Sequence, residues 1–404
     1  MPDLAPFRGL RYADVDSLDT VTAPPYDVIE EDERVALEEL DRHNAVRLIL
    51  PRASAAGDPY ETAASDLAAW QRDGVLILDA VPTLTVSRMT ATRPDGREHH
   101  TIGVIGAMGL PPRPGADDIL PHERTLPKAR SDRLALLRAT RANLDPIWAL
   151  SLAPGLTELL VDVACPAAAL DGAGTRHEFG VVADPDRIAA IRALVATAPA
   201  VLADGHHRFE TACNYRDEDP AAPGNDAIMT LVVELADDQL DVHPIHRIVR
   251  GGPEGLRSAL GATCAIEPAG ANTPQGVAAL VTAMTRRGAL GLVDGAGLAL
   301  LVPNETGPAH RLASEPLALQ GVDAARFDAC VRPSLGRANL SYRNDAETVA
   351  GVVRAGNADA AVLLRGVGVD EIRACAAAGI RMPEKTTFFS PKPRTGMVFR
   401  LLDA

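Results

Sequence analysis

The sharpest local signal in this chain is Val201-Leu202-Ala203-Asp204-Gly205-His206-His207-Arg208, where an apolar strand runs into a glycine turn. We expect a helix to begin directly after the glycine and to run to about Tyr215. The first N–H groups of a helix have no partner within it, and they lie at the positive end of its dipole. A buried strand that leads into such a turn therefore predicts a binding site for an anion.

Polar side chains at this turn add chemistry to the backbone. Arg208 can hold a phosphate group through two parallel N–H bonds, and Asp204 at the strand end can bind Mg²⁺ or accept a proton. His206 and His207 offer further hydrogen-bond donors. The structural alternative is an Asp204 cap on the helix with both histidines in solvent. We favour the functional interpretation, because a cap alone does not require this many polar residues after an apolar strand.

Two other loops carry candidate site residues. Prolines bound the sequence His122-Glu123-Arg124, whose side chains either face a ligand or belong to an ordinary surface loop. Near the N-terminus, Pro24-Pro25-Tyr26-Asp27 predicts a rigid turn that can hold a catalytic carboxylate in place. Asp27 and Glu30 also have the spacing of a helix capping box, so both interpretations of this turn stay open.

The remaining histidines and the basic tail favour structural interpretations. His243 and His246 have the spacing of helical metal ligands, but Pro244 lies between them and the pattern is that of a strand. The pair His99-His100 precedes a predicted strand, which favours a solvated position. Three basic residues of the tail either bind an anionic group or, as we favour, pair with surface carboxylates: Lys385, Lys392 and Arg394.

Helix and strand patterns alternate irregularly along the chain, which predicts an α+β fold with mixed sheets. Strands are expected at residues 45–50, 75–78, 84–89, 102–110, 147–152, 201–203, 228–235, 298–302 and 361–364. Helices are expected at residues 31–42, 60–71, 132–141, 185–196, 206–215, 273–287, 345–355 and 369–378. Proline and glycine clusters at 111–115 and 251–253 divide the chain into three regions, 1–110, 111–250 and 251–404.

Composition and charge disfavour several classes of protein. The 404 residues carry 40 basic and 54 acidic side chains, and the net charge of −14 repels nucleic-acid phosphates. Aromatic residues make up 3% of the chain, which leaves few platforms for stacking bases. The sequence lacks a signal-peptide pattern and a membrane-length apolar stretch, and its five scattered cysteines suit a reducing compartment. We therefore expect a cytoplasmic protein that binds neither nucleic acid nor membranes.

Four ordered motifs together resemble a known family. They are Pro24–Ile29, Leu120–Thr125, Asp204–Ala212 and Lys385–Lys392, and they span nearly the whole chain. They resemble the bacterial and archaeal domain-of-unknown-function family DUF1015, members of which have been linked to ATP-dependent phosphorylation of free L-serine. The third motif is also similar to that of serine kinases with the ParB/sulfiredoxin fold. One departure is Phe389-Ser390, where many relatives have Phe-Tyr.

The resemblance implies a ParB/sulfiredoxin-like core in region 111–250 that binds ATP with Mg²⁺. It places five residues at the nucleotide phosphates: Asp204, Gly205, His206, His207 and Arg208. His122, Glu123 and Arg124 match a family motif and are further candidates for binding the cofactor. Asp204 would hold Mg²⁺ and act on charge that develops in the transition state. The candidates for removing the proton of the acceptor hydroxyl are Asp27, Glu30 and His206.

The function expected from these residues is a small-molecule kinase that converts free L-serine into O-phosphoserine. Common phosphate-loop, dinucleotide, nucleophile-elbow and zinc-helix motifs are absent from the sequence. Two alternatives stay open. One is a nucleotide-dependent switch or regulatory binding protein, and the other is a metal-dependent hydrolase that uses His122, His206 and His207. The sequence leaves open the acceptor, the choice of ATP or ADP as donor, and the oligomeric state.

Overall fold

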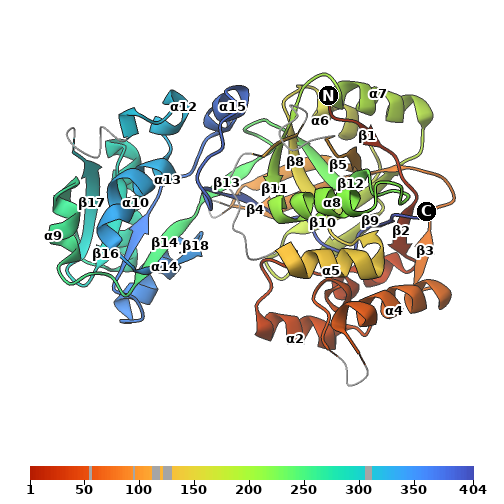
Figure 1. Ribbon diagram of the computed structural model, residues 1–404, viewed down its shortest axis with the longest axis horizontal. Helices are drawn as coiled ribbons and strands as arrows, with labels where there is room; N and C mark the ends of the chain where they lie inside the picture. Colours follow the sequence, from red (N-terminus) through yellow and green to blue (C-terminus); the bar gives the residue numbers. More distant parts are fainter. Residues whose placement is uncertain (54–56, 94–95, 112–118, 122–129, 305–311) are drawn as a thin grey trace. The chain divides into compact units, whose positions relative to one another are not determined.

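The computed structural model describes residues 1–53, 57–93, 96–111, 119–121, 130–304 and 312–404. Figure 1 colours the chain from its N-terminus in red to its C-terminus in blue. The chain divides into two compact units. Unit 1 takes its residues from 1–121, 125–240 and 391–404, and unit 2 is built on residues 241–390. Both units combine sheets with helices, which confirms the α+β prediction.

Unit 1 contains a nine-stranded mixed sheet. In spatial order its strands are β6 (Ile119–Pro121), β11 (Ala200–Asp204), β8 (Ile147–Ser151), β12 (Ala227–Glu234), β5 (Glu98–Gly109), β4 (Leu84–Thr92), β10 (Arg176–Val182) and β9 (Ala167–Leu170), and β1 (Leu4–Ala5) pairs with β5. The pairs β12–β8 and β11–β6 are parallel, and the other pairs are antiparallel. The helices whose apolar side chains share the core of this sheet are α6 (Leu156–Leu160), α7 (Pro185–Val195) and α8 (His206–Glu218).

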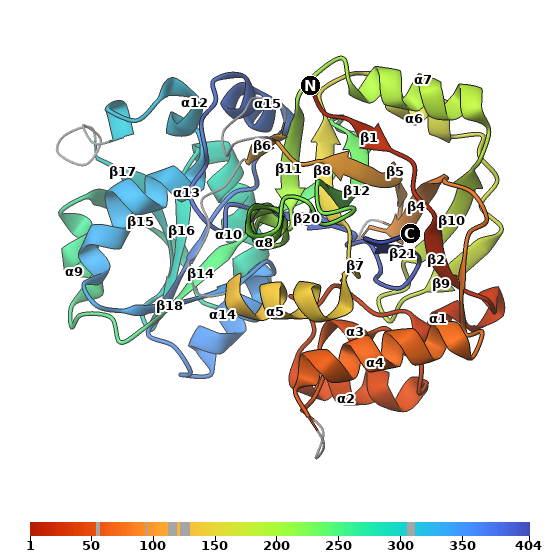
Figure 2. The same ribbon diagram turned by 45° about the vertical axis from the view of Figure 1, so that its right-hand side comes forward.

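A four-stranded sheet in unit 1 brings the two ends of the chain together. Its spatial order is β3 (Leu76–Leu78), β2 (Gly9–Tyr12), β21 (Phe399–Leu401) and β7 (Ala142–Asn143). The helices around its apolar core are α1 (Leu18–Val21), α2 (Glu31–Leu40), α3 (Val46–Ile49), α4 (Pro59–Arg72) and α5 (Arg130–Thr140). Figure 2 shows α2, α3 and α4 gathered together in red and orange. Because β21 lies beside β2, the segment before it passes the N-terminal segment, where Ala23 and Thr395 pair.

One predicted strand is wrong. The segment 45–50 forms the helix α3, and Asn44 Oδ1 just before it accepts from the Val46 N–H (2.9 Å). A short apolar run looks the same in a buried strand and in a buried helical turn, so the pattern alone cannot separate them. The eight predicted helices are confirmed, with ends within three residues of the predicted ones.

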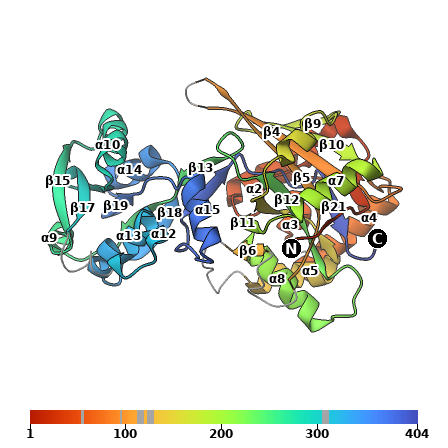
Figure 3. The same cartoon turned by 90° about the horizontal axis from the view of Figure 1, so that it is seen from above.

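Unit 2 contains an antiparallel six-stranded sheet. In spatial order its strands are β15 (Cys264–Gly270), β17 (Gly297–Pro303), β16 (Leu290–Asp294), β19 (Ala360–Leu363), β14 (His246–Arg250) and β18 (Asn339–Arg343). Figure 3 shows α10 (Pro274–Arg287) and α14 (Ala346–Arg354) next to each other against this sheet, with which they share a core. The unit also contains α9 (Leu256–Gly261), α12 (Leu317–Gln320), α13 (Asp323–Arg326), η3 (Phe327–Val331), η4 (Arg332–Leu335), α15 (Val369–Ala377), and the two-stranded sheet of β13 (Asp241–Pro244) and β20 (Thr387–Ser390).

The boundaries of the two units differ from those of the three regions expected from the proline and glycine clusters. Regions 1–110 and 111–250 contribute neighbouring strands, β5 and β12, to the same sheet. The strand β14, at the end of region 111–250, belongs to the sheet of unit 2. Proline clusters mark breaks in regular structure, but strand pairing across the breaks determines which segments share a core. None of the helices in the described residues is long and apolar enough to cross a membrane.

Candidate functional site

The predicted strand, glycine turn and helix are present in unit 1. Strand β11 ends at Asp204, Gly205 takes the left-handed conformation (φ 87°), and α8 begins at His206. A Cβ atom on Gly205 would lie 2.7 Å from Ile147 Cγ2, which is closer than packed carbon atoms approach. Glycine is therefore required here both for its backbone conformation and for its size.

Gly205→Ala is expected to destabilise the fold more than Gly155→Ala does. Gly155 is also a left-handed residue before a helix (φ 96°), but a Cβ there meets no atom within 4 Å. Gly155→Ala should cost about 1–2 kcal/mol of unfolding free energy from backbone strain alone. Gly205→Ala should cost about 1–3 kcal/mol more because of the contact with Ile147. Equal losses in urea unfolding of the two variants would contradict this account of the turn.

Charged side chains from three distant segments meet beside this turn. Lys392 Nζ donates to Asp204 Oδ1 (2.8 Å) and lies 3.5 Å from Asp27 Oδ2. Arg208 Nη2 donates to the other oxygen of Asp204 (3.1 Å), and its Nη1 donates to the carbonyl of Pro146 (2.6 Å). We call Asp27, Asp204, Arg208 and Lys392 the Asp204 cluster. It joins the end of β11, the first turn of α8, the Pro24–Asp27 turn and the tail.

Mutual attraction keeps Asp204 and Lys392 charged. Burial alone would raise the pKa of Asp204, but Lys392 and Arg208 hold the pKa of this carboxyl well below its usual range. Burial alone would lower the pKa of Lys392, but Asp204 and Asp27 raise it above the ordinary value. Asp204 and Lys392 are therefore an ion pair at neutral pH. Asp27 is the more accessible carboxylate, with 39% of its side chain exposed against 24% for Asp204.

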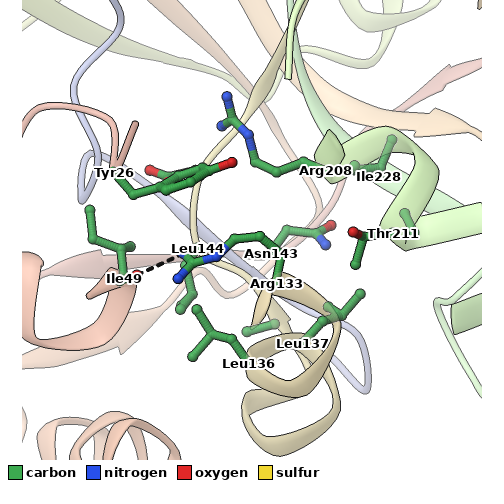
Figure 4. Close-up of a pocket in the computed structure, with 13 residues that line it drawn as sticks. Tyr26, Ile49, Arg133, Leu136, Leu137, Asn143, Leu144, Arg208, Thr211 and Ile228 are labelled. Carbon is green, nitrogen blue, oxygen red and sulfur yellow. Dashed lines mark hydrogen bonds between the residues drawn. The ribbon is translucent and has the colours of Figure 1, made fainter. Parts of the chain in front are cut away.

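A small cavity of about 60 Å³ adjoins the cluster through the side chain of Arg208. The Tyr26 ring borders it, with the guanidinium carbon of Arg133 4.4 Å and that of Arg208 5.7 Å from the ring centre. Figure 4 shows this ring beside the two arginines, with Asn143 and Thr211 farther along the cavity. Asp145 also lines it, and burial raises the pKa of this carboxyl. The other lining residues are mostly apolar: Ile49, Leu136, Leu137, Ala142, Leu144, Ala212 and Ile228.

The structure brings part of the predicted site together. Asp27, Asp204 and Arg208 meet in the cluster, and His206 and His207 lie half-buried in the first turn of α8. Glu30 immediately precedes α2, with an exposed side chain. The predictions for His122, Glu123 and Arg124 lie outside the described residues.

Sequence reasoning missed several residues of the site. Lys392 does pair with carboxylates, as favoured, but its partners are Asp204 and Asp27 of the candidate site. The signal for Lys392 was its place at the end of the fourth family-like motif. Arg133 and Asp145 stand in no motif of the sequence, and only the structure places them beside Tyr26 and Arg208.

The Asp204 cluster is not a preformed site for a metal ion. Among the described residues, no group of three or more His, Cys, Asp or Glu side chains is placed to hold a metal ion. Both oxygens of Asp204 accept hydrogen bonds from cationic groups, so this carboxylate does not form an open ligand set by itself. Mg²⁺ keeps several waters and commonly reaches proteins through substrate phosphates and one or two carboxylates. Asp204 or Asp27 can supply such a carboxylate.

The other histidines have structural surroundings. His246 lies in β14 and is buried, its Nδ1 accepts from the Leu364 N–H (3.1 Å), and burial lowers its pKa to about 4. His243 lies in β13 and contacts Ser390 Oγ through Nε2 (3.1 Å). The prediction of a solvated pair is wrong for His99, which is buried in β5 with Arg93 donating to its Nδ1 (2.9 Å). Alternation along β5 turns His99 inward and leaves His100 exposed.

Fold and site together define an α+β protein with a charged strand-to-helix turn next to a small cavity. The chain belongs to the DUF1015 family of proteins of unknown function, whose model matches residues 4–324. This match confirms the family resemblance and covers the first three of the four motifs, whereas Lys385–Lys392 lies beyond the matched residues. A search of curated proteins found no match to the chain.

Several solved structures are distantly similar to the chain. A conserved hypothetical protein from Pyrococcus furiosus has 13% identity and a TM-score of 0.40, and the match covers 74% of this chain and 96% of that one. A free serine kinase in complex with AMP has 13% identity and a TM-score of 0.41, with 74% and 92% covered. SbnI from Staphylococcus aureus, truncated at its C-terminus, has 12% identity and a TM-score of 0.39, with 74% and 87% covered. TM-scores this low do not support an argument about the site.

Proposed function

We propose that this protein is an ATP-dependent small-molecule kinase that phosphorylates the hydroxyl group of free L-serine, giving O-phosphoserine and ADP. The observation that carries the proposal is the Asp204 cluster, which sets an accessible carboxylate, Asp27, beside cations at the start of α8. A kinase needs this pairing, because it must bind phosphates next to a group that accepts a proton. We further propose that β11, α8 and their neighbours form a ParB/sulfiredoxin-like core.

The start of α8 would bind the phosphates of the donor nucleotide. The start of a helix favours an anion through its dipole and its first N–H groups, and α8 begins directly after the turn at Gly205. Arg208 and Lys392 would exchange part of their contact with Asp204 for phosphate oxygens. His206 and His207 stand in the same turn as further donors, and His122, Glu123 and Arg124 remain predicted nucleotide contacts.

Asp27 would act on the acceptor. In the transfer step the serine hydroxyl oxygen bonds to the γ-phosphorus of ATP, the bond from that phosphorus to the bridging oxygen breaks, and ADP leaves. The hydroxyl proton passes to the Asp27 carboxylate, for which Glu30 and His206 are the alternatives. Lys392, Arg208 and the Mg²⁺ that accompanies ATP would balance the negative charge on the transferred group.

The direct test is to incubate the purified protein with Mg-ATP and a panel of amino acids and related alcohols. Mass spectrometry should find O-phosphoserine and ADP in equal amounts when L-serine is present. Omitting Mg²⁺ should abolish the product, because the ion belongs to the donor substrate. If no hydroxyl compound in the panel is phosphorylated while the nucleotide binds, the kinase proposal is wrong.

Arg208→Ala is expected to remove most of the stabilisation that a nucleotide gives to the fold. Mg-ATP at about a hundred times its Kd should stabilise the native protein by about 2.7 kcal/mol, visible as a rise in melting temperature. The matched control is Arg187→Ala, because Arg187 pairs with Asp162 on the exposed face of α7. An unchanged nucleotide-induced shift in a folded Arg208→Ala variant would contradict the placing of the phosphates at α8.

Two other functions make different predictions. A nucleotide-dependent switch would bind nucleotide and change conformation without any turnover. A metal-dependent hydrolase built on His122, His206 and His207 would hold a transition metal tightly, so elemental analysis would find about one ion per chain. The proposed kinase should carry no such ion, because it takes its Mg²⁺ with ATP.

Its use of ATP and free serine would place it in the cytoplasm, with no nucleic-acid or membrane partner.

A further inference from the structure

The tail segment that carries Lys392 is bound to the N-terminal segment that carries Asp27. The Ala23 N–H donates to the Thr395 carbonyl (3.1 Å), and the Thr395 N–H donates back to the Ala23 carbonyl (2.8 Å). Asp27 lies four residues after this backbone bridge, and Lys392 lies three residues before it. The contacts that hold the bridge in place therefore also decide where the two charged side chains lie.

Prolines make both connections to the bridge stiff. Pro24-Pro25 lies between the bridge and Asp27. In the tail, Pro391 and Pro393 flank Lys392. Each proline fixes its own φ angle and restricts the residue before it to extended conformations. A displacement of the bridge would therefore move the two charged side chains, because the short segments between them have little freedom to absorb it.

Arg394 binds the N-terminal segment next to this bridge. Its Nε donates to Thr22 Oγ1 (2.6 Å) and its Nη2 donates to the Thr22 carbonyl (2.7 Å). Thr22 is held in turn, because its hydroxyl donates to the Leu18 carbonyl (2.5 Å) and Asn44 Nδ2 donates to the Thr22 carbonyl (3.2 Å). Arg394 and Thr22 are both buried. The planar guanidinium is suited to two oxygen atoms at fixed positions, whereas a flexible ammonium is not.

Stability alone does not explain a buried arginine at this place. The hydrogen bonds of Arg394 among the described residues go to the neutral oxygen atoms of Thr22, and burial lowers the pKa of Arg394. The carboxylates of Asp19, Glu33 and Asp171 oppose this shift, but none of these three forms an ion pair with it. Burying a cation in this way costs free energy that an apolar side chain would avoid. What the guanidinium provides is a fixed geometry between the two segments.

The ammonium of Lys392 depends on that geometry. Its Nζ lies 2.8 Å from Asp204 Oδ1 and 3.5 Å from Asp27 Oδ2, with 11% of the side chain exposed. Hydrogen bonds of this kind have lengths of about 2.7–3.2 Å, so moving the tail by about 1 Å would break the bond to Asp204. The ammonium would then become more accessible to solvent.

We propose that Arg394 is a positioning residue of the Asp204 cluster, which fixes the tail on Thr22 and thereby holds the ammonium of Lys392 in place. The inference rests on the proposed function where it concerns turnover, because there Lys392 balances the charge of the transferred phosphate. The placing of Lys392 itself can be measured without any turnover.

The first test measures how fast acetic anhydride modifies Lys392. Only an uncharged amine reacts, so the ion pair with Asp204 protects this side chain. The chain contains three lysines, Lys128, Lys385 and Lys392, and mass spectrometry of peptides can follow Lys392 against the exposed Lys385. In Arg394→Met, Lys392 should react about tenfold faster than in the wild type, as expected when a charge-assisted hydrogen bond is lost. Arg394→Lys keeps one donor and should give an intermediate rate.

Arg400→Met is the matched control for a purely structural effect. Arg400 is also a buried arginine of the tail, and its donors bind neutral oxygen atoms of Asn143, Ala227 and Gly224. Urea unfolding should show that both arginine variants are folded and less stable than the wild type, but Lys392 should keep its wild-type reaction rate in Arg400→Met. Equal rates for Lys392 in the two variants would reduce Arg394 to a structural role and overturn the proposal.

Thr22→Val tests the contact through which Arg394 acts. Valine keeps the shape of threonine but removes the acceptor for Arg394 Nε, so Lys392 should again react faster than in the wild type. Combining Thr22→Val with Arg394→Met should give no further increase over Arg394→Met alone, because both changes break the same contact. Independent, multiplying increases would contradict the proposed path. This variant also tests the proposal if Arg394→Met does not fold.

Turnover connects the inference to the proposed kinase. In Arg394→Met, kcat should fall about tenfold or more, because misplacing a group by about 1 Å can cost up to about 10²-fold in rate. The KM for L-serine should change little, and Arg394→Lys should recover part of kcat. If Lys392 becomes reactive as expected but the wild type forms no O-phosphoserine, the positioning role holds and the kinase proposal fails. If O-phosphoserine forms and Arg394→Met keeps both the wild-type kcat and the protection of Lys392, the kinase proposal holds and the positioning role fails.

Discussion

Asp27→Asn is expected to lower the kcat for L-serine phosphorylation by about 10²–10⁴-fold, the usual contribution of a positioned general base. The reason is its place: Asp27 is the accessible carboxylate of the Asp204 cluster, held at the end of a proline turn and 3.5 Å from Lys392. The melting shift induced by Mg-ATP should stay close to that of the wild type, because the amide cannot accept the proton but leaves the phosphate donors intact.

Two further variants decide whether Asp27 is the base. Glu30→Gln changes the competing carboxylate three residues away, and Asp32→Asn changes an exposed acid in the first turn of α2 that serves as the control. We expect a large loss of kcat only in Asp27→Asn. A larger loss in Glu30→Gln than in Asp27→Asn would contradict the assignment and move the role to Glu30.

Lys392→Met is expected to impair both stability and turnover. Without the ammonium, Asp204 keeps only Arg208 as a cationic partner, so an incompletely compensated carboxylate remains in a mostly buried position. Removing one partner of a fully buried pair costs about 3–5 kcal/mol, and we expect about 2 kcal/mol here because water reaches part of Asp204. Loss of a cation aimed at the transferred phosphate should lower kcat by about 10²-fold or more.

The double variant Lys392→Met with Asp204→Asn separates these two effects. Removing both charges should restore most of the lost stability in urea unfolding, since one anion and one cation leave together and Arg208 keeps the nearby charge of Asp145, whereas turnover should stay low. Lys385→Met is the control, because Lys385 is an exposed lysine of unit 2 in the same tail motif. Two results would contradict the role of this ion pair. One is that the stability losses of Lys392→Met and Asp204→Asn simply add in the double variant, and the other is that Lys392→Met phosphorylates L-serine at the wild-type rate.

Local features of the site could be predicted because their physical causes are local. The turn at Gly205 follows from an apolar strand, a glycine and the start of a helix within eight consecutive residues, and backbone conformation at such a turn depends mainly on near neighbours. Most of the helices were predictable for the same reason, since an amphipathic period of 3.6 residues extends over them, although α7 and α8 show little of it. The segment 45–50 was too short for either period to decide, and packing around Asn44 made it helical.

The pairing partners could not be predicted in the same way. His99 and His100 are adjacent in the sequence, yet the alternation of β5 buries one and exposes the other. Asp145 stands in none of the sequence motifs, yet it is buried, and Thr395 from the tail donates to its carboxylate. Such contacts depend on which strands pair and in which order, information that no local window of sequence contains.

The sequence by itself therefore determined the α+β class, the family and the backbone of the strand-to-helix turn, since periodicity, glycine conformation and short motifs act over a few residues. Only the tertiary structure decided that Lys392, 188 residues after Asp204, completes the site, because β21 pairs with β2 and draws the tail across unit 1. It also decided that Tyr26, Asp145 and Arg208 line one cavity. An ion pair or a cavity wall forms where packing brings distant side chains together. The charge of a buried group then depends on how deeply it is buried and on which charged groups lie beside it.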